Sequence, residues 1–142
     1  NVSEVIEHIV AYLRNRISNK VDFILPEENE VFAQMNVPLF EWVIENITKN
    51  AVDAMEGKGT ITYVVKTHGA MIQIDIRDTG KGIPSSKLKR VFEPGFTTKK
   101  RGWGLGLSLV KRIVENYHNG KIFVAESELG KGTTFRILLN KA

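Results

Sequence analysis

The stretch Gly102-Trp103-Gly104-Leu105-Gly106-Leu107-Ser108 places three alternating glycines directly before an apolar run with helical spacing. Glycines let a backbone approach a ligand closely, and the first N–H groups of a helix have no intrahelical partner and lie at the positive end of its dipole. A phosphate group is therefore a natural ligand here, although glycine-rich turns before helices are often plain connections. The apolar positions of the run are Leu105, Leu109, Val110, Ile113, Val114 and Tyr117.

Three amphipathic helices are predicted from apolar residues that recur every three or four positions. The first helix is capped by Asn1 or Ser3 and ends near residues 17–19. The second begins at Pro38 and ends near Met55, because proline suits a first helical turn. The third follows the glycine stretch and ends near Tyr117, and a short helical piece is expected around residues 85–91.

Short strands are predicted in pairs between these helices. Ile72, Ile74 and Ile76 alternate with polar residues, which indicates a strand with one buried face. Pro26-Glu27-Glu28-Asn29 has turn chemistry and predicts a hairpin between the first two strands. Paired strands between helices favour an α+β sandwich with helices on one face over a doubly wound parallel sheet. The predicted strands are residues 21–25, 31–35, 60–67, 71–78, 121–126 and 133–139.

Composition describes one globular domain. The 142 residues are 42% hydrophobic and 25% charged, and no apolar run approaches the roughly 20 residues of a membrane span. The chain has no cysteine, which is compatible with a reducing cytoplasm. The net charge is +4, and much of the basic excess lies at residues 87–101. These basic residues form either a solvated surface or a loop beside an anionic ligand. Nucleic-acid binding is disfavoured because aromatic residues do not alternate with the basic ones.

Two polar constellations are candidates for ligand binding. Asn46, Asn50 and Asp53 are spaced i, i+4 and i+7 and form one stripe on the second helix. This stripe is either a solvated face or a place where Asn50 offers its carbonyl oxygen to a hard cation such as Mg²⁺. Asp78 ends a strand and enters a glycine loop, where it either initiates a turn or accepts a hydrogen bond from an exocyclic amine.

In combination these stretches resemble the gyrase-like ATPase superfamily and, within it, the catalytic ATP-binding domain of bacterial histidine kinases. The resemblance implies the two-layer α/β sandwich called the Bergerat fold, with three main helices on one face of a mixed, mostly antiparallel sheet of about five strands plus a small hairpin. The matching motifs are Glu45-Asn46-Ile47-Thr48-Lys49-Asn50-Ala51-Val52-Asp53-Ala54 (N box), Asp78-Thr79-Gly80-Lys81-Gly82-Ile83 (first glycine box), Val91-Phe92-Glu93-Pro94-Gly95-Phe96-Thr97-Thr98-Lys99 (F box), Gly102 to Leu107 (second glycine box) and the late turn Gly130-Lys131-Gly132-Thr133-Thr134-Phe135.

The resemblance implies a Mg-ATP site. Asn50 would bind Mg²⁺, Asp78 would accept the adenine amine directly and through a water held by Thr79 or Thr133, and residues 93–101 would form an ATP lid. Asn50 and Lys99 are the implied catalytic residues. The implied nucleotide-binding set is Asn46, Lys49, Asn50, Asp53, Asp78, Thr79, Gly80, Gly82, Ile83, Thr98, Lys99, Gly102, Gly104, Leu105, Gly106, Leu107 and Thr133.

Phosphoryl transfer to a protein is favoured over ATP hydrolysis. Hydrolysing members of the superfamily carry a glutamate four residues before the metal asparagine, whereas this chain has Asn46 there. Glu45 is one position away and points about 100° around the helix. In histidine kinases the acceptor histidine is typically followed by an acidic residue, and none of His8, His68 and His118 is. The acceptor is therefore expected outside this sequence.

The resemblance also implies partners and a setting. We expect one domain, residues 1–142, taken from a longer homodimeric kinase, with a dimerisation and phosphotransfer domain and a response regulator as partners, no nucleic acid, and the isolated domain a monomer. The expected location is cytoplasmic, alone or as the cytosolic part of a membrane-bound sensor. Alternatives are a stand-alone serine kinase of the anti-sigma-factor type and a non-catalytic nucleotide-sensing module. Ala54 lacks the aromatic ring that often lies against adenine. Trp103 either packs against the lid or the helix, or is an exposed anchor for the helical domain or the lid.

Overall fold

The structure is a computed structural model that describes residues 1–17, 19–27, 30–88, 90–93 and 106–142. Within these residues, five strands form one mixed sheet in the order β1-β2-β3-β5-β4. β1 pairs in parallel with β2, and the other neighbours are antiparallel. In chain order the elements are α1 (Val2–Arg14), β1 (Val21–Ile24), α2 (Val37–Ala54), β2 (Gly59–His68), β3 (Met71–Asp78), the 3-10 turn η1 (Ser85–Lys87), α3 (Gly106–Arg112), the π-helical turn η2 (Ile113–Tyr117), β4 (Lys121–Glu128) and β5 (Gly132–Asn140).

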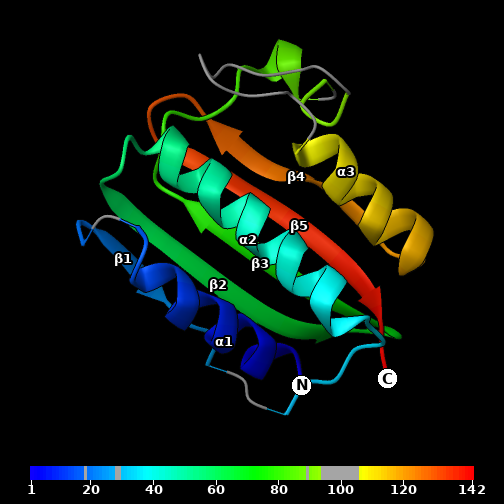
Figure 1. The fold of residues 1–142 in the computed structure, drawn as a ribbon. Coiled ribbons are helices and arrows are strands. Elements are labelled where there is room, and N and C mark those ends of the chain that lie inside the picture. Colours follow the sequence, from blue (N-terminus) through cyan, green and yellow to red (C-terminus); the bar gives the residue numbers. More distant parts are fainter. Residues whose placement is uncertain (18, 28–29, 89, 94–105) are drawn as a thin grey trace.

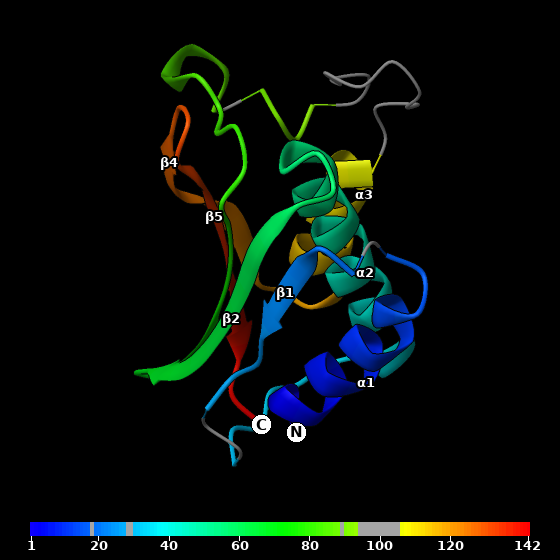
Figure 2. The same cartoon turned by 90° about the vertical axis from the view of Figure 1, so that its left-hand side faces the viewer.

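The three α-helices lie on one face of the sheet, which confirms the predicted two-layer α+β sandwich (Figures 1 and 2). Asn1 is the cap of α1, because its side chain accepts the N–H of Glu4 at 3.1 Å. Asn36 caps α2 in the same way and Pro38 lies in the first turn. α1 ends at Arg14, earlier than predicted. In the part of the chain that the structure describes, no helix combines the length and the apolar character needed to cross a membrane.

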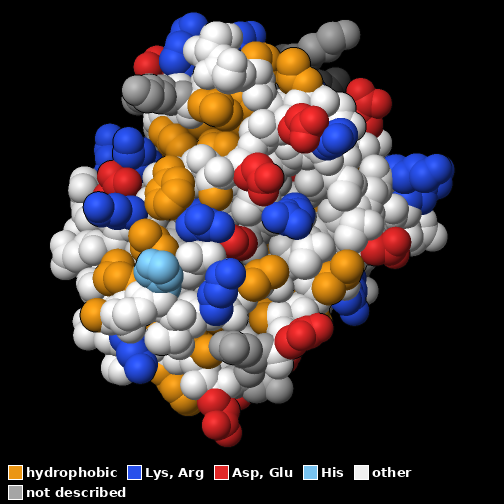
Figure 3. All heavy atoms as spheres, turned by 180° about the vertical axis from the view of Figure 1, so that it is seen from behind, with side chains coloured by type: hydrophobic (Ala, Val, Ile, Leu, Met, Phe, Trp, Pro, Cys, Tyr) orange, Lys and Arg blue, Asp and Glu red, His pale blue; other side chains and the backbone are white. Residues whose placement is uncertain are grey.

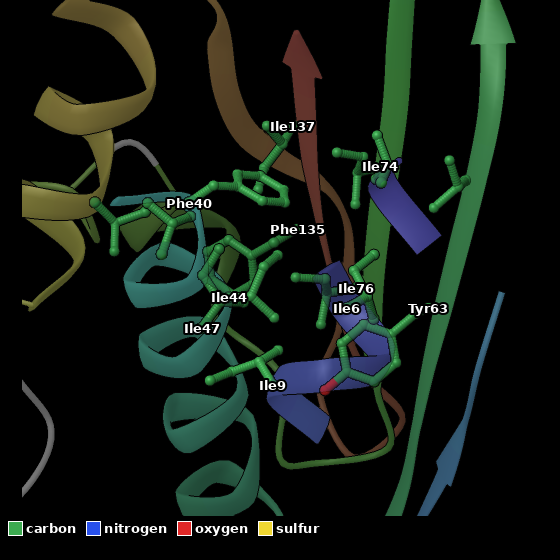
Figure 4. Packing of buried hydrophobic residues seen from close by; sticks show 14 of the residues in the cluster. Ile6, Ile9, Phe40, Ile44, Ile47, Tyr63, Ile74, Ile76, Phe135 and Ile137 are labelled. Carbon is green, nitrogen blue, oxygen red and sulfur yellow. The ribbon is translucent and has the colours of Figure 1, made fainter. Parts of the chain in front are cut away.

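The core lies between the helices and the sheet. The predicted alternation in β3 is confirmed, since Ile72, Ile74 and Ile76 are fully buried beneath the helices. Figure 4 shows Ile74 and Ile76 of β3 and Ile137 of β5 facing the apolar side of α2. A buried hydrogen bond of 2.7 Å joins the Thr48 hydroxyl of α2 to the Tyr63 hydroxyl of β2, and burial raises the pKa of Tyr63 to about 12. The helical layer is thus held to the sheet mainly by apolar packing.

The predicted hairpin of residues 21–25 and 31–35 is wrong. β1 pairs in parallel with β2, and the chain between these two strands passes through α2. Residues 31–35 contribute only one isolated bridge among the described residues, between Ala33 and Lys141. This segment lies beside the C-terminal end of β5, where Gln34 N donates to Asn140 O at 2.9 Å. Turn chemistry at Pro26 indicated that the chain reverses, but the strand partner was decided by burial of Val21 and Phe23 against the helical layer.

The third helix ends at the predicted place but changes character. Its last turn, η2, is π-helical, and Leu109 and Tyr117 of its apolar run are 38% and 69% exposed rather than buried. The buried His118 follows it, with Nδ1 at 3.0 Å from Ile113 O and Nε2 accepting the Asn36 N–H at 3.0 Å. The imidazole therefore ties the end of this helix to the start of α2.

The other face of the sheet carries no helix in the described residues and mixes charged with apolar side chains (Figure 3). Asp75 of β3 and Arg136 of β5 form a two-bond ion pair there, at 2.8 and 3.0 Å. Gln73 donates to Asp75 at 3.2 Å, and both residues are buried although the alternation predicted a polar, exposed row. Burial alone therefore does not mark the core face of this strand.

Candidate functional site

The predicted site residues that the structure describes gather at one end of the sandwich. The end of β3, the C-terminus of α2, the turn between β4 and β5 and the start of α3 all lie there (Figures 1 and 2). These segments come from four distant parts of the sequence. The fold therefore brings together motifs that the sequence only places in order.

Asp78 is the buried carboxylate of this end. It follows Ile72, Ile74 and Ile76 on the helix-facing side of β3, so the alternation that buries those isoleucines also buries Asp78, which is 3% exposed. Its carboxylate accepts the N–H of Gly80 at 2.8 Å and that of Thr133. Burial raises the pKa of Asp78, and these two N–H groups partly offset that rise. Among the described residues no cation pairs with it, so its remaining acceptor capacity is available to a ligand donor.

The loop after Asp78 is held by two neighbouring elements. Lys81 N donates to the Ala54 carbonyl of α2 at 3.0 Å, and Gly130 N donates to the Lys81 carbonyl at 2.9 Å. A Cβ on Gly80 would lie 2.7 Å from the Ala54 backbone. Gly82 has φ +77°, and a Cβ there would overlap the Glu128 carbonyl oxygen. Both glycines of the first glycine box are thus required by close backbone packing beside Asp78.

The two threonines predicted to hold a water differ in their surroundings. The Thr79 hydroxyl accepts the Thr60 N–H at 3.1 Å and contacts Met55 Sδ at 3.5 Å, so it faces β2 and α2. Thr133 lies directly opposite Asp78 in the β3–β5 register and is 5% exposed. Thr133 is therefore the better placed of the two to share a ligand with Asp78.

The polar stripe of α2 borders the same end. Asn46 donates through Nδ2 to Trp42 O at 2.8 Å, and its Oδ1 lies 3.9 Å from the position of a Cβ on Gly106, so it faces the start of α3. The Asn50 side chain is half-buried and makes no hydrogen bond with any described residue. Lys49 is exposed and lies 3.7 Å from Glu45, and Asp53 is exposed.

The residues at this end fit Mg²⁺ only as the sequence predicted, with the Asn50 amide oxygen as a single protein ligand. Within the described ranges no group of three or more His, Cys, Asp or Glu side chains could hold a metal ion. Mg²⁺ is commonly held by few protein oxygens, with phosphate oxygens and water completing its octahedron. A single amide oxygen such as that of Asn50 beside a bound triphosphate satisfies this requirement.

Part of the predicted site lies outside the described residues, namely Thr98, Lys99, Gly102, Gly104, Leu105, the Trp103 side chain and most of the predicted lid. Of the segment predicted to hold phosphates, Gly106 is exposed and Leu107 packs against the core. Their roles stay predictions.

Two residues to which no individual role was assigned from the sequence support the site. Ser127 Oγ accepts the Ile83 N–H at 2.8 Å and so holds the end of the glycine loop. Phe92, within the F box, packs edge-on against Phe135 with ring centroids 6.0 Å apart. Phe92 belongs to the F box that the sequence showed, whereas no sequence pattern marked Ser127.

Comparison with known proteins adds the family. Residues 35–142 match the family of histidine kinase-, DNA gyrase B-, and HSP90-like ATPases. The chain is 33% identical over 143 residues to sporulation kinase A of Bacillus subtilis, covering 99% of this chain and 23% of that protein. It is 44% identical over 97 residues to the sensor histidine kinase ZraS of Escherichia coli, covering 68% of this chain and 20% of that protein. The chain thus spans about a fifth of the length of these relatives.

Solved structures show the same fold. The catalytic domain of histidine kinase ThkA superposes with a TM-score of 0.88 at 28% identity, covering 99% of this chain and 93% of that chain. ThkA in complex with the response regulator protein TrrA gives a TM-score of 0.85 at 24% identity, covering all of this chain and 41% of that chain. With the match over residues 35–142, these likenesses establish that the chain belongs to the histidine kinase-, DNA gyrase B-, and HSP90-like ATPase family.

Proposed function

We propose that this chain is the ATP-binding catalytic domain of a longer sensor histidine kinase, which binds Mg-ATP and transfers the γ-phosphoryl group to a histidine on a separate helical domain. The family match and the named sensor histidine kinases among its relatives support this activity. Those names favour a histidine kinase over the serine kinase alternative. A phosphotransfer experiment distinguishes the histidine kinase from the non-catalytic nucleotide-sensing module.

The burial of the Asp78 carboxylate is the observation that supports the proposed nucleotide most directly. A buried carboxylate is costly without a partner, and here two backbone N–H groups satisfy only part of it. The exocyclic amine of adenine is a donor of the right kind, and guanine presents a carbonyl oxygen at the same position. A carboxylate that stays ionised therefore selects adenine over guanine.

The phosphate end of the nucleotide would lie toward the Asn46–Asn50 stripe. The proposed adenine pocket would be bounded by Gly80 and Gly82. Asn50 lies one helical turn before Ala54, whose backbone a Cβ on Gly80 would overlap. Mg²⁺, when bound, would neutralise phosphate charge and fix the γ-phosphate, with Asn50 as its protein ligand. Lys99 is proposed as the further phosphate contact, from the family resemblance alone.

The reaction needs little covalent chemistry from this chain. A nitrogen of the acceptor imidazole forms a bond to the γ-phosphorus while the bond to the β–γ bridging oxygen breaks, and ADP leaves with that electron pair. The domain's task is to hold the nucleotide in line with the acceptor. Asn46, in place of a water-activating glutamate, supports transfer over hydrolysis.

The proposed partners follow from the same chemistry. The acceptor histidine belongs to a dimerisation and phosphotransfer domain of the same homodimeric protein, and the phosphoryl group then passes to a response regulator. ThkA has been solved with such a regulator, TrrA. A cytoplasmic location, where ATP is supplied, completes the proposal.

Titration calorimetry of the domain with Mg-ATP tests the nucleotide site. Asp78→Asn removes the charge that accepts the adenine amine, and Asn50→Ala removes the metal ligand, so each should weaken binding at least about tenfold. Asp78→Asn should bind ATP no better than GTP. Exposed Thr67, which pairs with Ile72 at the end of β2 and β3 remote from Asp78, gives the control Thr67→Ala, which should bind as the wild type does.

Phosphotransfer is tested in the full-length protein. Incubation with γ-labelled ATP should give an acid-labile, base-stable phosphoprotein, as expected of phosphohistidine. Acid-stable label would favour the serine kinase, and tight ATP binding without any label would favour the nucleotide-sensing module. Wild-type affinity in both Asp78→Asn and Asn50→Ala would contradict the site itself.

A further inference from the structure

We infer that Ser127 is a positioning residue of the base-recognition site: it acts through Thr133 and Ile83 to hold the edge that reads adenine beside Asp78. The inference rests on the proposed nucleotide site. Ser127 itself is not proposed to touch the nucleotide.

Ser127 is the junction of three hydrogen bonds from two different segments. Its oxygen accepts the Ile83 N–H at 2.8 Å, lies 2.8 Å from Thr133 Oγ1 and lies 3.3 Å from the Gly132 carbonyl oxygen. Thr133 donates its own N–H to Asp78. Ser127 therefore links the two ends of the glycine loop, Asp78 through Thr133 and Ile83 directly.

A β-bulge directs Ser127 toward the site. Val124 pairs with Phe135 and faces the core, and in a regular strand the third residue after it would face the opposite side of the sheet. The register shifts between Val124 and Glu126, so Ala125 is an extra residue and Ser127 comes to lie opposite Thr133. Bulges commonly re-aim a side chain next to a functional site, and this one places a hydroxyl where the loop needs an acceptor.

The hydrogen-bond donors and acceptors around Ser127 explain why a hydroxyl group is needed at this position. Ser127 has one proton and accepts from Ile83, so it either donates to Gly132 O and accepts from Thr133, or donates to Thr133 and leaves the Thr133 proton for a ligand. In both cases the Thr133 hydroxyl is oriented by Ser127. Without it, the buried Thr133 hydroxyl and the Ile83 N–H lose their partner together.

The test compares two nucleotides that differ only in the exocyclic amine, ATP and purine riboside triphosphate, each with Mg²⁺, by titration calorimetry. The wild type should prefer ATP by about tenfold or more, because the charged Asp78 accepts the amine. Ser127→Ala should weaken ATP binding about tenfold and purine riboside triphosphate binding about twofold, so that the preference falls. Ser127→Thr, which keeps the hydroxyl, should restore the preference.

Thr134→Ala is the matched control. Thr134 is a buried neighbour whose hydroxyl accepts a part-buried hydrogen bond from Arg77 Nε at 3.2 Å on the opposite face of the sheet, so its loss removes a hydrogen bond away from the loop. It should lower the melting temperature and leave the ATP preference at its wild-type value. Where Ser127→Ala does not fold by circular dichroism, Ser127→Cys, of similar size but a weak acceptor, replaces it and should also reduce the preference.

The outcomes separate the two proposals. A folded Ser127→Ala or Ser127→Cys variant with a wild-type preference, or one that weakens both nucleotides equally, overturns the positioning role while the Asp78 site stands. A wild type that binds neither nucleotide, or binds both equally, overturns the proposed base recognition and this inference with it.

Discussion

At the scale of single residues, Asp78 is the position where folding and recognition conflict. Its neighbours on the same face of β3 are buried isoleucines, and an apolar residue there would continue the core. The chain instead buries a carboxylate with two backbone N–H donors and no counterion among the described residues. Such exceptions to the local pattern are expected at functional sites. Burial of the Asp78 carboxylate lowers the stability of the unliganded domain. The same burial makes the carboxylate selective for a ligand that donates an amine hydrogen.

Asp78→Asn should therefore stabilise the unliganded domain at neutral pH while it abolishes adenine selectivity. Because the pKa of Asp78 is raised by burial, the folded state binds the proton more readily than the unfolded chain does. The wild type consequently loses stability as the pH rises from the ordinary value of 3.8 through the raised pKa of Asp78, and the penalty is gone only below that ordinary value.

Urea unfolding of both proteins between pH 4 and 8 checks this prediction. The stability advantage of Asp78→Asn should be present at pH 7 and should shrink toward pH 4. An advantage that is absent at every pH, or that grows on acidification, would contradict the assigned cause of the shift.

At the scale of elements, the site depends on close approaches between loops and their neighbours. The loop after β3 packs on the C-terminus of α2 through Gly80 and on the β4–β5 hairpin through Gly82. The same hairpin carries the bulge that turns Ser127 toward Thr133. A change in any of these contacts shifts the loop relative to Asp78, without any change in the residues that face the ligand.

Gly82→Ala tests this dependence. Both Gly82 and Gly57 have positive φ, +77° and +80°, but a Cβ on Gly82 would overlap the Glu128 carbonyl, whereas nothing lies within 4 Å of one on Gly57. Gly57→Ala should cost about 1 kcal/mol from backbone strain alone. Gly82→Ala should cost about 3 kcal/mol or more, because the overlap adds to that strain.

Chemical denaturation gives both values, and calorimetry with Mg-ATP gives the functional consequence. Gly57→Ala should bind as the wild type does, while Gly82→Ala should bind more weakly even where it remains folded. Equal stability losses in the two variants would show that the Glu128 contact is unimportant.

At the scale of the whole molecule, a single helical layer on one face of the sheet leaves the site at one end, where four chain segments converge (Figure 1). A nucleotide bound there would contact the end of the sheet and α2 together. It would thus stabilise the fold as a unit rather than one loop.

Mg-ATP at about 100 times its dissociation constant should add about 2.7 kcal/mol and raise the melting temperature by on the order of 10 °C. The shift should grow with ATP concentration and decrease when EDTA removes the Mg²⁺. Asp78→Asn should show little shift although its unliganded form melts no lower. A large, unchanged shift in that variant would mean that ATP binds somewhere else.

Much of the architecture could be read from local pattern. Alternation at Ile72, Ile74 and Ile76, the cap residue Asn1 and the helix-starting Pro38 predicted their elements, because burial on one face and the chemistry of a first helical turn act over a few residues. The motif order also predicted the family and the two-layer fold, which the comparisons confirm. The proposed roles of Asn50 and Lys99 stay predictions.

What only the tertiary structure decided are the pairings between distant segments. Residues 31–35 do not form the expected hairpin with β1, because a strand's partner depends on which distant surface buries its side chains. Thr133 rather than Thr79 lies opposite Asp78, and Ser127 supports it through a one-residue bulge. Such contacts depend on register across the sheet. A local pattern records which residues are apolar or polar, but register is settled only when the whole core packs.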